Sequence, residues 1–295
     1  MSSRRPRLLT ISLAACAPAI GLAIAAMPAA SAATHTGHPA TGHLSALAKA
    51  TIKARDYLRH LTVGQHGTDQ RVPGHTRAIN GLTQVHSTNW SGYADDNTRG
   101  NTYTSLTANW TEPTGTCTST TSLAVFWVGI DGFSSGSVEQ DGTLIECSGG
   151  RAFYFTWWEM FPTNSIQTVG STVRPGDSIH ASVVRSGTSY TLAVTDSTTP
   201  GNSFSTTQTC SSCANSSAEW IAEAPSNSSG VLPLTNFHSW TASSATVKSG
   251  STSGVISTFA DDELTMVDGS GLVKAQPGAL NSSGNGFTVT WERST

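Results

Sequence analysis

The chain has 295 residues, of which 12% are charged, and its formal net charge at pH 7 is −3. This charge is unevenly distributed, because residues 1–84 carry nine Lys and Arg against two acidic residues, whereas residues 85–295 carry seven against seventeen. An acidic body with so few cations argues against a nucleic-acid-binding protein, so we expect no nucleic-acid partner.

Residues 1–32 have the pattern of a secretory signal peptide. Arg4 and Arg5 precede an apolar, alanine-rich run that ends in the small residues Ala30-Ser31-Ala32, as a cleavage site requires. Prolines and a glycine break the run, and no later segment approaches the roughly 20 apolar residues that a membrane span needs. The sequence therefore predicts a secreted, extracellular protein without a membrane anchor.

Residues 33–84 form a basic segment that contains six of the nine histidines. Within it, residues 44–62 place small and apolar side chains at helical spacing, which predicts one amphipathic helix; residues 64–81 read as a polar loop. Because the segment is cationic and the remainder of the chain is anionic, we interpret it as a propeptide that docks on the acidic body. A flexible N-terminal tail is the alternative.

Residues 85–295 are predicted to form one all-β domain. Short runs rich in β-branched and aromatic residues alternate with Gly, Ser, Asn and Asp clusters at intervals of about 8–12 residues, as in β-sandwiches. The clearest runs are Tyr103–Trp110, Leu123–Ile130, Ala152–Met160, Ser178–Arg185, Ser189–Asp196, Glu219–Ala222, Ser244–Lys248 and Gly286–Trp291. This spacing favours an antiparallel β-sandwich or barrel.

Four cysteines remain once the signal peptide is removed: Cys117, Cys147, Cys210 and Cys213. An even set in an exported chain favours two disulfides. Three connectivities are possible, and we prefer Cys117–Cys147 with a local Cys210–Cys213 loop. A redox or zinc motif at Cys210-x-x-Cys213 is the alternative, but it lacks a βαβ context or a second ligand pair.

The common hydrolase motifs are not convincing. Residues 132–136 spell Gly-x-Ser-x-Gly, but a nucleophile elbow needs a following helix, and residues 137–142 read as a short strand that ends in a turn. His-Glu-x-x-His is absent, and the body holds only the scattered His86, His180 and His238. We therefore expect no metal site.

Several carboxylates lie among aromatic residues instead. Asp131, Glu159, Glu219 and Glu223 all occur within or at the end of apolar runs. Burial of an acid is costly and raises its pKa, which makes each a candidate for general acid–base catalysis. The alternative is that alternation along the strands points these acids to solvent. The residues alone do not show which of the four acids is the best candidate for catalysis.

Five segments, which occur in one order, together resemble the eqolisins, or glutamic peptidases. They are Asn89-Trp90-Ser91-Gly92, Trp127–Gly132, the segment around Gln140, Trp157–Pro162 and Ala218–Glu223. The resemblance extends from about residue 87 to the C-terminus. It implies a concanavalin-like sandwich of two antiparallel sheets, made as a secreted zymogen whose propeptide acts as an intramolecular inhibitor.

The resemblance also implies residue roles. Gln140 and Glu223 match the catalytic dyad, and the supporting or substrate-binding positions fall on Asp131, Glu159, Trp90, Trp127, Glu219 and Phe161. Phe161 stands where the family often has tyrosine, and the four cysteines depart from the multi-disulfide pattern of better-known members. These departures put the substrate preference and the pH optimum in doubt.

The expected function is acid endoproteolysis of protein or peptide substrates by a monomer without a cofactor. Glu223 as carboxylate would activate water, and the Gln140 amide would stabilise the tetrahedral intermediate. Because an ordinary glutamate has a pKa near 4, activity is expected in acid, and insensitivity to pepstatin is expected from the family. A β-sandwich glycoside hydrolase or a non-catalytic carbohydrate-binding module is the alternative, although a glutamine cannot serve as the second carboxylate of a glycosidase.

Overall fold

The computed structural model describes residues 68–79, 81–96, 100–170, 172–259 and 262–295. The predicted signal peptide, residues 1–32, and the predicted helix, residues 44–62, lie outside these residues, as does most of the predicted propeptide. Within the described ranges, no helix is long and apolar enough to cross a membrane.

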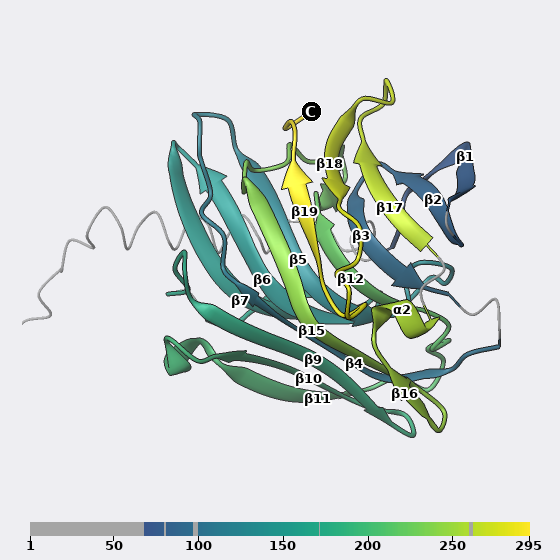
Figure 1. Ribbon diagram of the computed structural model, residues 1–295. Helices are drawn as coiled ribbons and strands as arrows, with labels where there is room; N and C mark the ends of the chain where they lie inside the picture. Colours follow the sequence, from purple (N-terminus) through teal and green to yellow (C-terminus); the bar gives the residue numbers. More distant parts are fainter. Residues whose placement is uncertain (1–67, 80, 97–99, 171, 260–261) are drawn as a thin grey trace, which may run out of the picture. The chain divides into compact units, whose positions relative to one another are not determined.

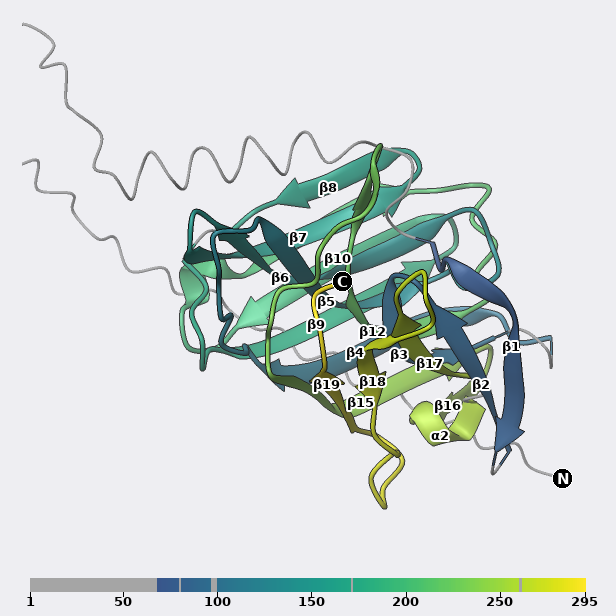
Figure 2. The same ribbon diagram turned by 90° about the horizontal axis from the view of Figure 1, so that it is seen from above.

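The larger sheet follows the order β8-β7-β6-β5-β12-β3-β17-β2-β1 (Figures 1 and 2). Strands β18 and β19 continue it beside β17. Its strands are β1 (Arg71–Ile79), β2 (Leu82–Ser87), β3 (Trp90–Asp95), β5 (Ser122–Ile130), β6 (Val138–Ser148), β7 (Arg151–Phe161), β8 (Asn164–Thr168), β12 (Ala218–Glu223), β17 (Asp262–Val267), β18 (Val273–Pro277) and β19 (Phe287–Trp291). These pairs are antiparallel except β2 with β17, which is parallel.

The smaller sheet follows the order β11-β10-β9-β4-β15-β16. Its strands are β4 (Tyr103–Thr111), β9 (Ser178–Ser186), β10 (Ser189–Asp196), β11 (Phe204–Thr209), β15 (Ser239–Ser249) and β16 (Thr252–Gly254). Strand β15 joins the sheets, because it pairs with β19 at its start and with β4 at its end (Figures 1 and 2). The remaining elements are a 3-10 turn η1 (Pro200–Asn202), β13 (Ser226–Asn227), β14 (Gly230–Val231) and α2 (Ile256–Phe259).

Alternation along the strands sends side chains to two separate apolar clusters. One lies between the sheets and includes Trp220 and Phe126 of the larger sheet with Leu192 of the smaller sheet. The other, called here the outer cluster, includes Trp90, Trp127, Trp157, Ile221 and Phe155 on the opposite face of the larger sheet. Strand β5 is buried along its whole length because both of its faces are covered.

The predicted two-sheet antiparallel sandwich is confirmed, but two local expectations were wrong. Residues 71–79, read as part of a loop, form β1 and pair with β2. The turn expected at Gly142 is the middle of β6. A Cβ atom on Gly142 would lie 1.9 Å from the Phe126 carbonyl oxygen, so this glycine allows close approach of two strands and ends neither.

Candidate active site

Gln140 and Glu159 face each other across the pair of strands β6 and β7. They are register partners, and the Gln140 Nε2 atom donates a 2.7 Å hydrogen bond to the Glu159 Oε2 atom. Both residues are buried. Within the described residues, the Gln140 Oε1 atom has no hydrogen-bond partner. The amide is therefore oriented by Glu159 and still offers its carbonyl oxygen and one N–H to a reactant.

Glu223 is the last residue of β12, on the face that carries the outer cluster. The Trp127 Nε1 atom donates a 2.8 Å hydrogen bond to the Glu223 Oε2 atom, whereas Oε1 has no partner among the described residues. Burial raises the pKa of Glu223 to about 7, and the polar groups of Trp127, Trp90 and Asn89 oppose that rise. One oxygen is thus held in place and the other can accept a proton.

Glu159 and Glu223 are close enough for their charges to interact. Burial and the charge of Glu223 together raise the pKa of Glu159 to about 8, although the hydrogen bond from Gln140 opposes this rise. Two carboxyl groups that repel each other are not both ionised until the pH is high. The structure therefore brings Gln140, Glu159 and Glu223 together.

The two tryptophans expected at the site also lie there. Trp90 is the register partner of Glu223, and its ring packs edge-on against Trp127, with 4.8 Å between ring centroids and 75° between planes. Both side chains are fully buried. They form an apolar floor that shields Glu223 from water and fixes the indole that binds it.

Glu219 lies on the same face of β12 as Glu223, four residues earlier. It pairs in register with Gly129, which also pairs with Gln140. A Cβ atom on Gly129 would lie 3.1 Å from the Gln140 Cβ atom, so glycine leaves space between the two side chains. Register alone therefore places Glu219 level with Gln140, whereas Glu223 pairs with Val125, which in turn pairs with Leu144. The bond from Trp127 and the charge interaction with Glu159 distinguish Glu223.

Glu219 has a different electrostatic environment. Burial raises its pKa well above the ordinary value, the Ser217 hydroxyl opposes this, and the charges of Asp131, Asp95 and Glu139 raise it further. A carboxyl group in such surroundings holds its proton more strongly than an ordinary glutamate does.

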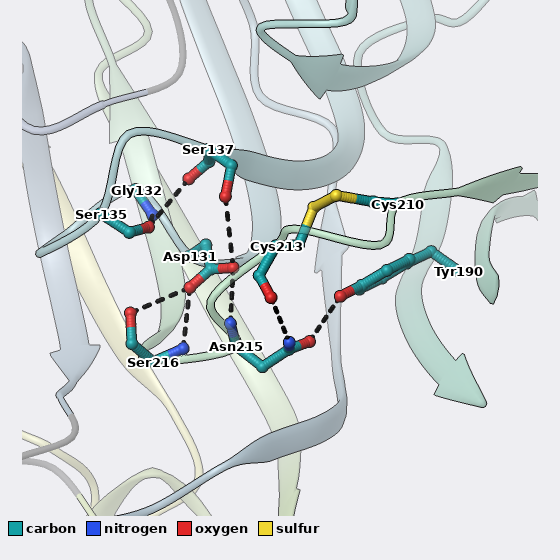
Figure 3. The surroundings of a disulfide bond; sticks show 9 residues. All are labelled: Asp131, Gly132, Ser135, Ser137, Tyr190, Cys210, Cys213, Asn215 and Ser216. Atoms are coloured by element: carbon teal, nitrogen blue, oxygen red, sulfur yellow. Dashed lines mark hydrogen bonds between the residues drawn. A yellow bond between two sulfur atoms is a disulfide. The ribbon is translucent and has the colours of Figure 1, made fainter. Parts of the chain in front are cut away.

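Asp131 holds two loops together beneath the site. It follows β5 in a left-handed conformation, with φ of 71°. Its carboxylate accepts hydrogen bonds of 2.7 Å from the backbone N–H groups of both Asn215 and Ser216, and one of 2.9 Å from the Ser216 hydroxyl (Figure 3). The Ser137 hydroxyl donates a fourth, at 3.4 Å. Asp131 therefore ties the end of β5 to the segment that precedes β12.

The Cys210–Cys213 disulfide lies in the chain segment that Asp131 binds (Figure 3). The Asn215 Nδ2 atom donates to the Cys213 carbonyl oxygen at 2.8 Å, and the Tyr190 hydroxyl donates to Asn215 Oδ1 at 2.5 Å. The second disulfide joins Cys117 to Cys147. Both preferred pairings are confirmed.

Glu139 and the two cysteines of the short disulfide could place ligand atoms within 4.8 Å of one another. The two sulfur atoms are bonded to each other, however, and metal binding by cysteine requires free thiolates. This group of residues therefore does not fit a metal ion.

Phe161 and Asn89 complete the list of residues near the site. Phe161 ends β7, is half-buried, and packs against the outer cluster. Asn89 was given no site role from the sequence, although it precedes Trp90 and its side chain faces Glu223. Asp69 was also missed, and its charge acts on Glu223. An asparagine beside an expected site tryptophan could have been flagged, whereas nothing local marks Asp69.

Comparison with known proteins identifies a family. The model of the peptidase A4 family matches residues 88–283. Aspergillopepsin-2 of Aspergillus niger is 26% identical over 258 residues, covering 77% of this chain and 87% of that protein.

Solved structures show the same fold. A scytalido-glutamic peptidase with a transition-state analog inhibitor has a TM-score of 0.59 at 23% identity, covering 70% of this chain and 98% of that one. SCP-B, an eqolisin in complex with the tripeptide Ala-Ile-His, has a TM-score of 0.57 at 22% identity with the same coverage. The aspergilloglutamic peptidase from Aspergillus niger has a TM-score of 0.51 at 27% identity, covering 58% of this chain and 99% of that one.

Proposed function

The chain belongs to the peptidase A4 family, the eqolisins or glutamic peptidases, and we propose that it is a secreted acid endopeptidase in which Glu223 and Gln140 activate the attacking water. The observation that supports this most directly is the pair of hydrogen bonds around Gln140 and Glu223. Glu159 orients the amide, and Trp127 orients the carboxylate. Each group keeps one oxygen without a partner in the described residues.

The proposed reaction uses these two oxygens to hold one water molecule. Glu223 accepts a proton from the water while the water oxygen bonds to the carbonyl carbon of the substrate. The remaining N–H of Gln140 donates to the oxygen that becomes negatively charged. Glu223 then returns the proton to the nitrogen of the departing amine as the C–N bond breaks. The products are a carboxylic acid and an amine, and no cofactor takes part.

The raised pKa of Glu223 sets a requirement for activity in acid. With a pKa of about 7, Glu223 is protonated in acid and cannot accept a proton from water. Much of that rise comes from burial, so exposing the site to solvent and substrate lowers the pKa toward the ordinary value near 4. Activity in acid therefore depends on opening the site.

We propose that the chain is exported as an inactive precursor and acts as a monomer on protein or peptide substrates. The signal pattern of residues 1–32 and the charge difference between residues 1–84 and 85–295 support export and a docked propeptide. The glycosidase and carbohydrate-binding alternatives lose support, because the chain belongs to a family of peptidases.

The proposal is tested with denatured protein as substrate between about pH 2 and pH 5, with and without pepstatin, after acid incubation of the precursor. We expect proteolysis that pepstatin does not inhibit and that Gln140→Ala reduces by at least about a hundredfold. Complete absence of proteolysis across this range would refute the peptidase proposal. Activity of Gln140→Ala equal to that of the wild type would refute the role of Gln140.

A further inference from the structure

A pocket of about 310 Å³ opens beside the turn that joins β17 to β18. Its walls come from that turn, from the hairpin β13–β14 and from the residue that precedes Asn89. The lining includes Val267, Asp268, Lys274, Thr88, Val231 and Leu232. The pocket, called here the Lys274 pocket, thus combines apolar walls with one acidic and one basic side chain, and no step of the proposed reaction uses it.

Lys274 is a buried cation without an ion-pair partner in the part of the chain that the structure describes. Its side chain is 4% exposed, and the ion pair found there joins Arg71 to Asp69 instead. Burial lowers the pKa of Lys274 to about 8, although the charge of Asp268 opposes this change, so the ammonium group is charged throughout the acid range. Burying a charge is costly unless it is paired and hydrogen-bonded, and an ammonium group has three N–H donors to offer.

The acidic residue of the pocket, Asp268, is engaged by its own turn. Its Oδ1 atom accepts hydrogen bonds from the backbone N–H groups of Ser270 at 2.8 Å and of Leu272 at 2.9 Å. The bond from Leu272 is the main cause of the lowered pKa of Asp268, and the charges of Arg293 and Lys274 act in the same direction. Because Asp268 holds its turn together and shares its charge with Arg293, Lys274 keeps its N–H donors for another anion.

Lys274 and Glu223 lie on the same face of the larger sheet. The next residue along β18, Ala275, belongs to the apolar cluster between the sheets, and successive side chains of a strand point to opposite faces. Lys274 therefore points to the face that carries the outer cluster and Glu223. Leu232, another wall of the pocket, packs against that outer cluster, which agrees with this placement.

Two walls of the pocket are connected by hydrogen bonds to the immediate neighbours of Glu223. The Ala224 N–H donates to the Asn89 carbonyl oxygen at 2.8 Å, and Thr88 is the residue before Asn89. The Leu232 N–H donates to the Pro225 carbonyl oxygen at 2.9 Å, two residues after Glu223. An extended peptide advances about 3.3 Å per residue, so a peptide bound over Glu223 reaches the pocket within a few residues of the bond that is cut.

We propose that the Lys274 pocket is a specificity subsite in which Lys274 binds a carboxylate of the substrate peptide, supplied by an Asp or Glu side chain or by the peptide's C-terminus. This inference rests on the proposed function and names a substrate class for the same site. A carboxylate fits because it accepts charge-assisted hydrogen bonds from the ammonium group, while Val231, Leu232 and Val267 exclude water around the pair. The carboxylates of a peptide ionise near pH 4, and Lys274 is charged on both sides of that pH, so the preference is present above about pH 4 and lost below it.

The test measures kcat/KM for two sets of matched peptides, at about pH 3 and about pH 5, with the enzyme obtained by acid incubation of the precursor. The first set carries Glu or Gln at each position around the cleaved bond in turn, and the second ends in a free carboxylate or an amide. The variants are Lys274→Met, which removes the charge at similar size, and Lys274→Arg, which keeps it. Lys248→Met is the matched control, because Lys248 is exposed on β15 of the smaller sheet.

We expect the wild type at about pH 5 to prefer the carboxylate by about tenfold, either as Glu over Gln at one position or as the free C-terminus over the amide, and to show no preference at about pH 3. Lys274→Met should abolish the preference, whereas Lys274→Arg and Lys248→Met should retain it.

Cleavage of the peptides by the wild type without any carboxylate preference would overturn the subsite while leaving the peptidase function standing, and this result does not depend on the folding of any variant. A preference that survives in folded Lys274→Met would also overturn the subsite. No cleavage of any peptide at either pH would overturn the proposed function and the subsite together.

Discussion

Replacing Trp127 with phenylalanine tests whether the hydrogen bond from Trp127 lowers the pKa of Glu223. The substitution removes the Nε1 donor that lies 2.8 Å from Glu223 Oε2 and keeps an aromatic ring in the outer cluster. A hydrogen bond to a charged group stabilises it by about 1.5 to 3 kcal/mol. The donor favours the ionised carboxylate, so its loss raises the pKa of Glu223, and about 1.4 kcal/mol corresponds to one pH unit.

The assay is the pH dependence of kcat/KM on a peptide substrate, measured for the enzyme after acid incubation of the precursor. The acidic limb of this profile reports the base that must be ionised in the free enzyme. We expect Trp127→Phe to move that limb to higher pH by about one to two units. The direction follows because a base with a raised pKa is ionised only at higher pH.

Trp157→Phe is the control for lost packing. Trp157 is 1% exposed, belongs to the same outer cluster, and its Nε1 atom has no partner among the described residues. Both variants should lose similar stability, but only Trp127→Phe should move the acidic limb. An unmoved limb in Trp127→Phe, or equal movement in both variants, would refute the role given to the Trp127–Glu223 hydrogen bond.

Two further predictions concern stability, measured by denaturant unfolding. Replacing the pair Cys117–Cys147 with serines should lower the free energy of unfolding by about 2 kcal/mol more than replacing Cys210–Cys213 does. The reason is that the sequence separations are 30 and 3 residues, and the disulfide that closes the longer loop restricts the unfolded chain more. Equal losses of stability in the two variants would contradict this account. Gly142→Ala should destabilise the fold by more than about 3 kcal/mol, since its Cβ atom would lie 1.9 Å from the Phe126 carbonyl oxygen. Gly136→Ala is the control, because a Cβ atom on Gly136 would have no atom within 4 Å, and it should change the stability by less than about 0.5 kcal/mol. A similar loss of stability in the Gly142 and Gly136 variants would show that the close approach of the strands does not cause the loss.

Much of the fold could be predicted because alternation and turn residues are local signals. The strand predicted at Ser189–Asp196 has the bounds observed for β10, and both preferred disulfide pairings are observed. Strand β6 was predicted to end at Gly142 because Asp-Gly is a common turn pair. The requirement that overrode this signal, close packing against the Phe126 carbonyl group, is a tertiary contact that no local pattern contains.

The site could be predicted only in part. Glu219 and Glu223 lie in one apolar strand, and which of them approaches Glu159 depends on how the sheet brings β12 and β7 together. The family resemblance chose Glu223, and the contact with Trp127 supplies a physical reason. Asp69 lies in a basic segment read as a loop, so neither charge nor periodicity indicated that it would face Glu223. That arrangement depends on contacts of Asp69 with Gly132 and of Gln70 with Asn89, which are distant in sequence.

The central claim is that Glu223, and not Glu219, accepts the proton from water. Glu223→Gln and Glu219→Gln are a matched pair, because both residues are buried on one face of β12 and glutamine has the shape of a protonated glutamate. The decisive measurement is kcat/KM in acid for the two variants with their propeptides removed. Thermal unfolding shows that both variants are folded. The account predicts a loss of at least about a thousandfold for Glu223→Gln and less than about tenfold for Glu219→Gln. A folded Glu223→Gln that retains activity while Glu219→Gln loses it would contradict the account and transfer the role of base to Glu219.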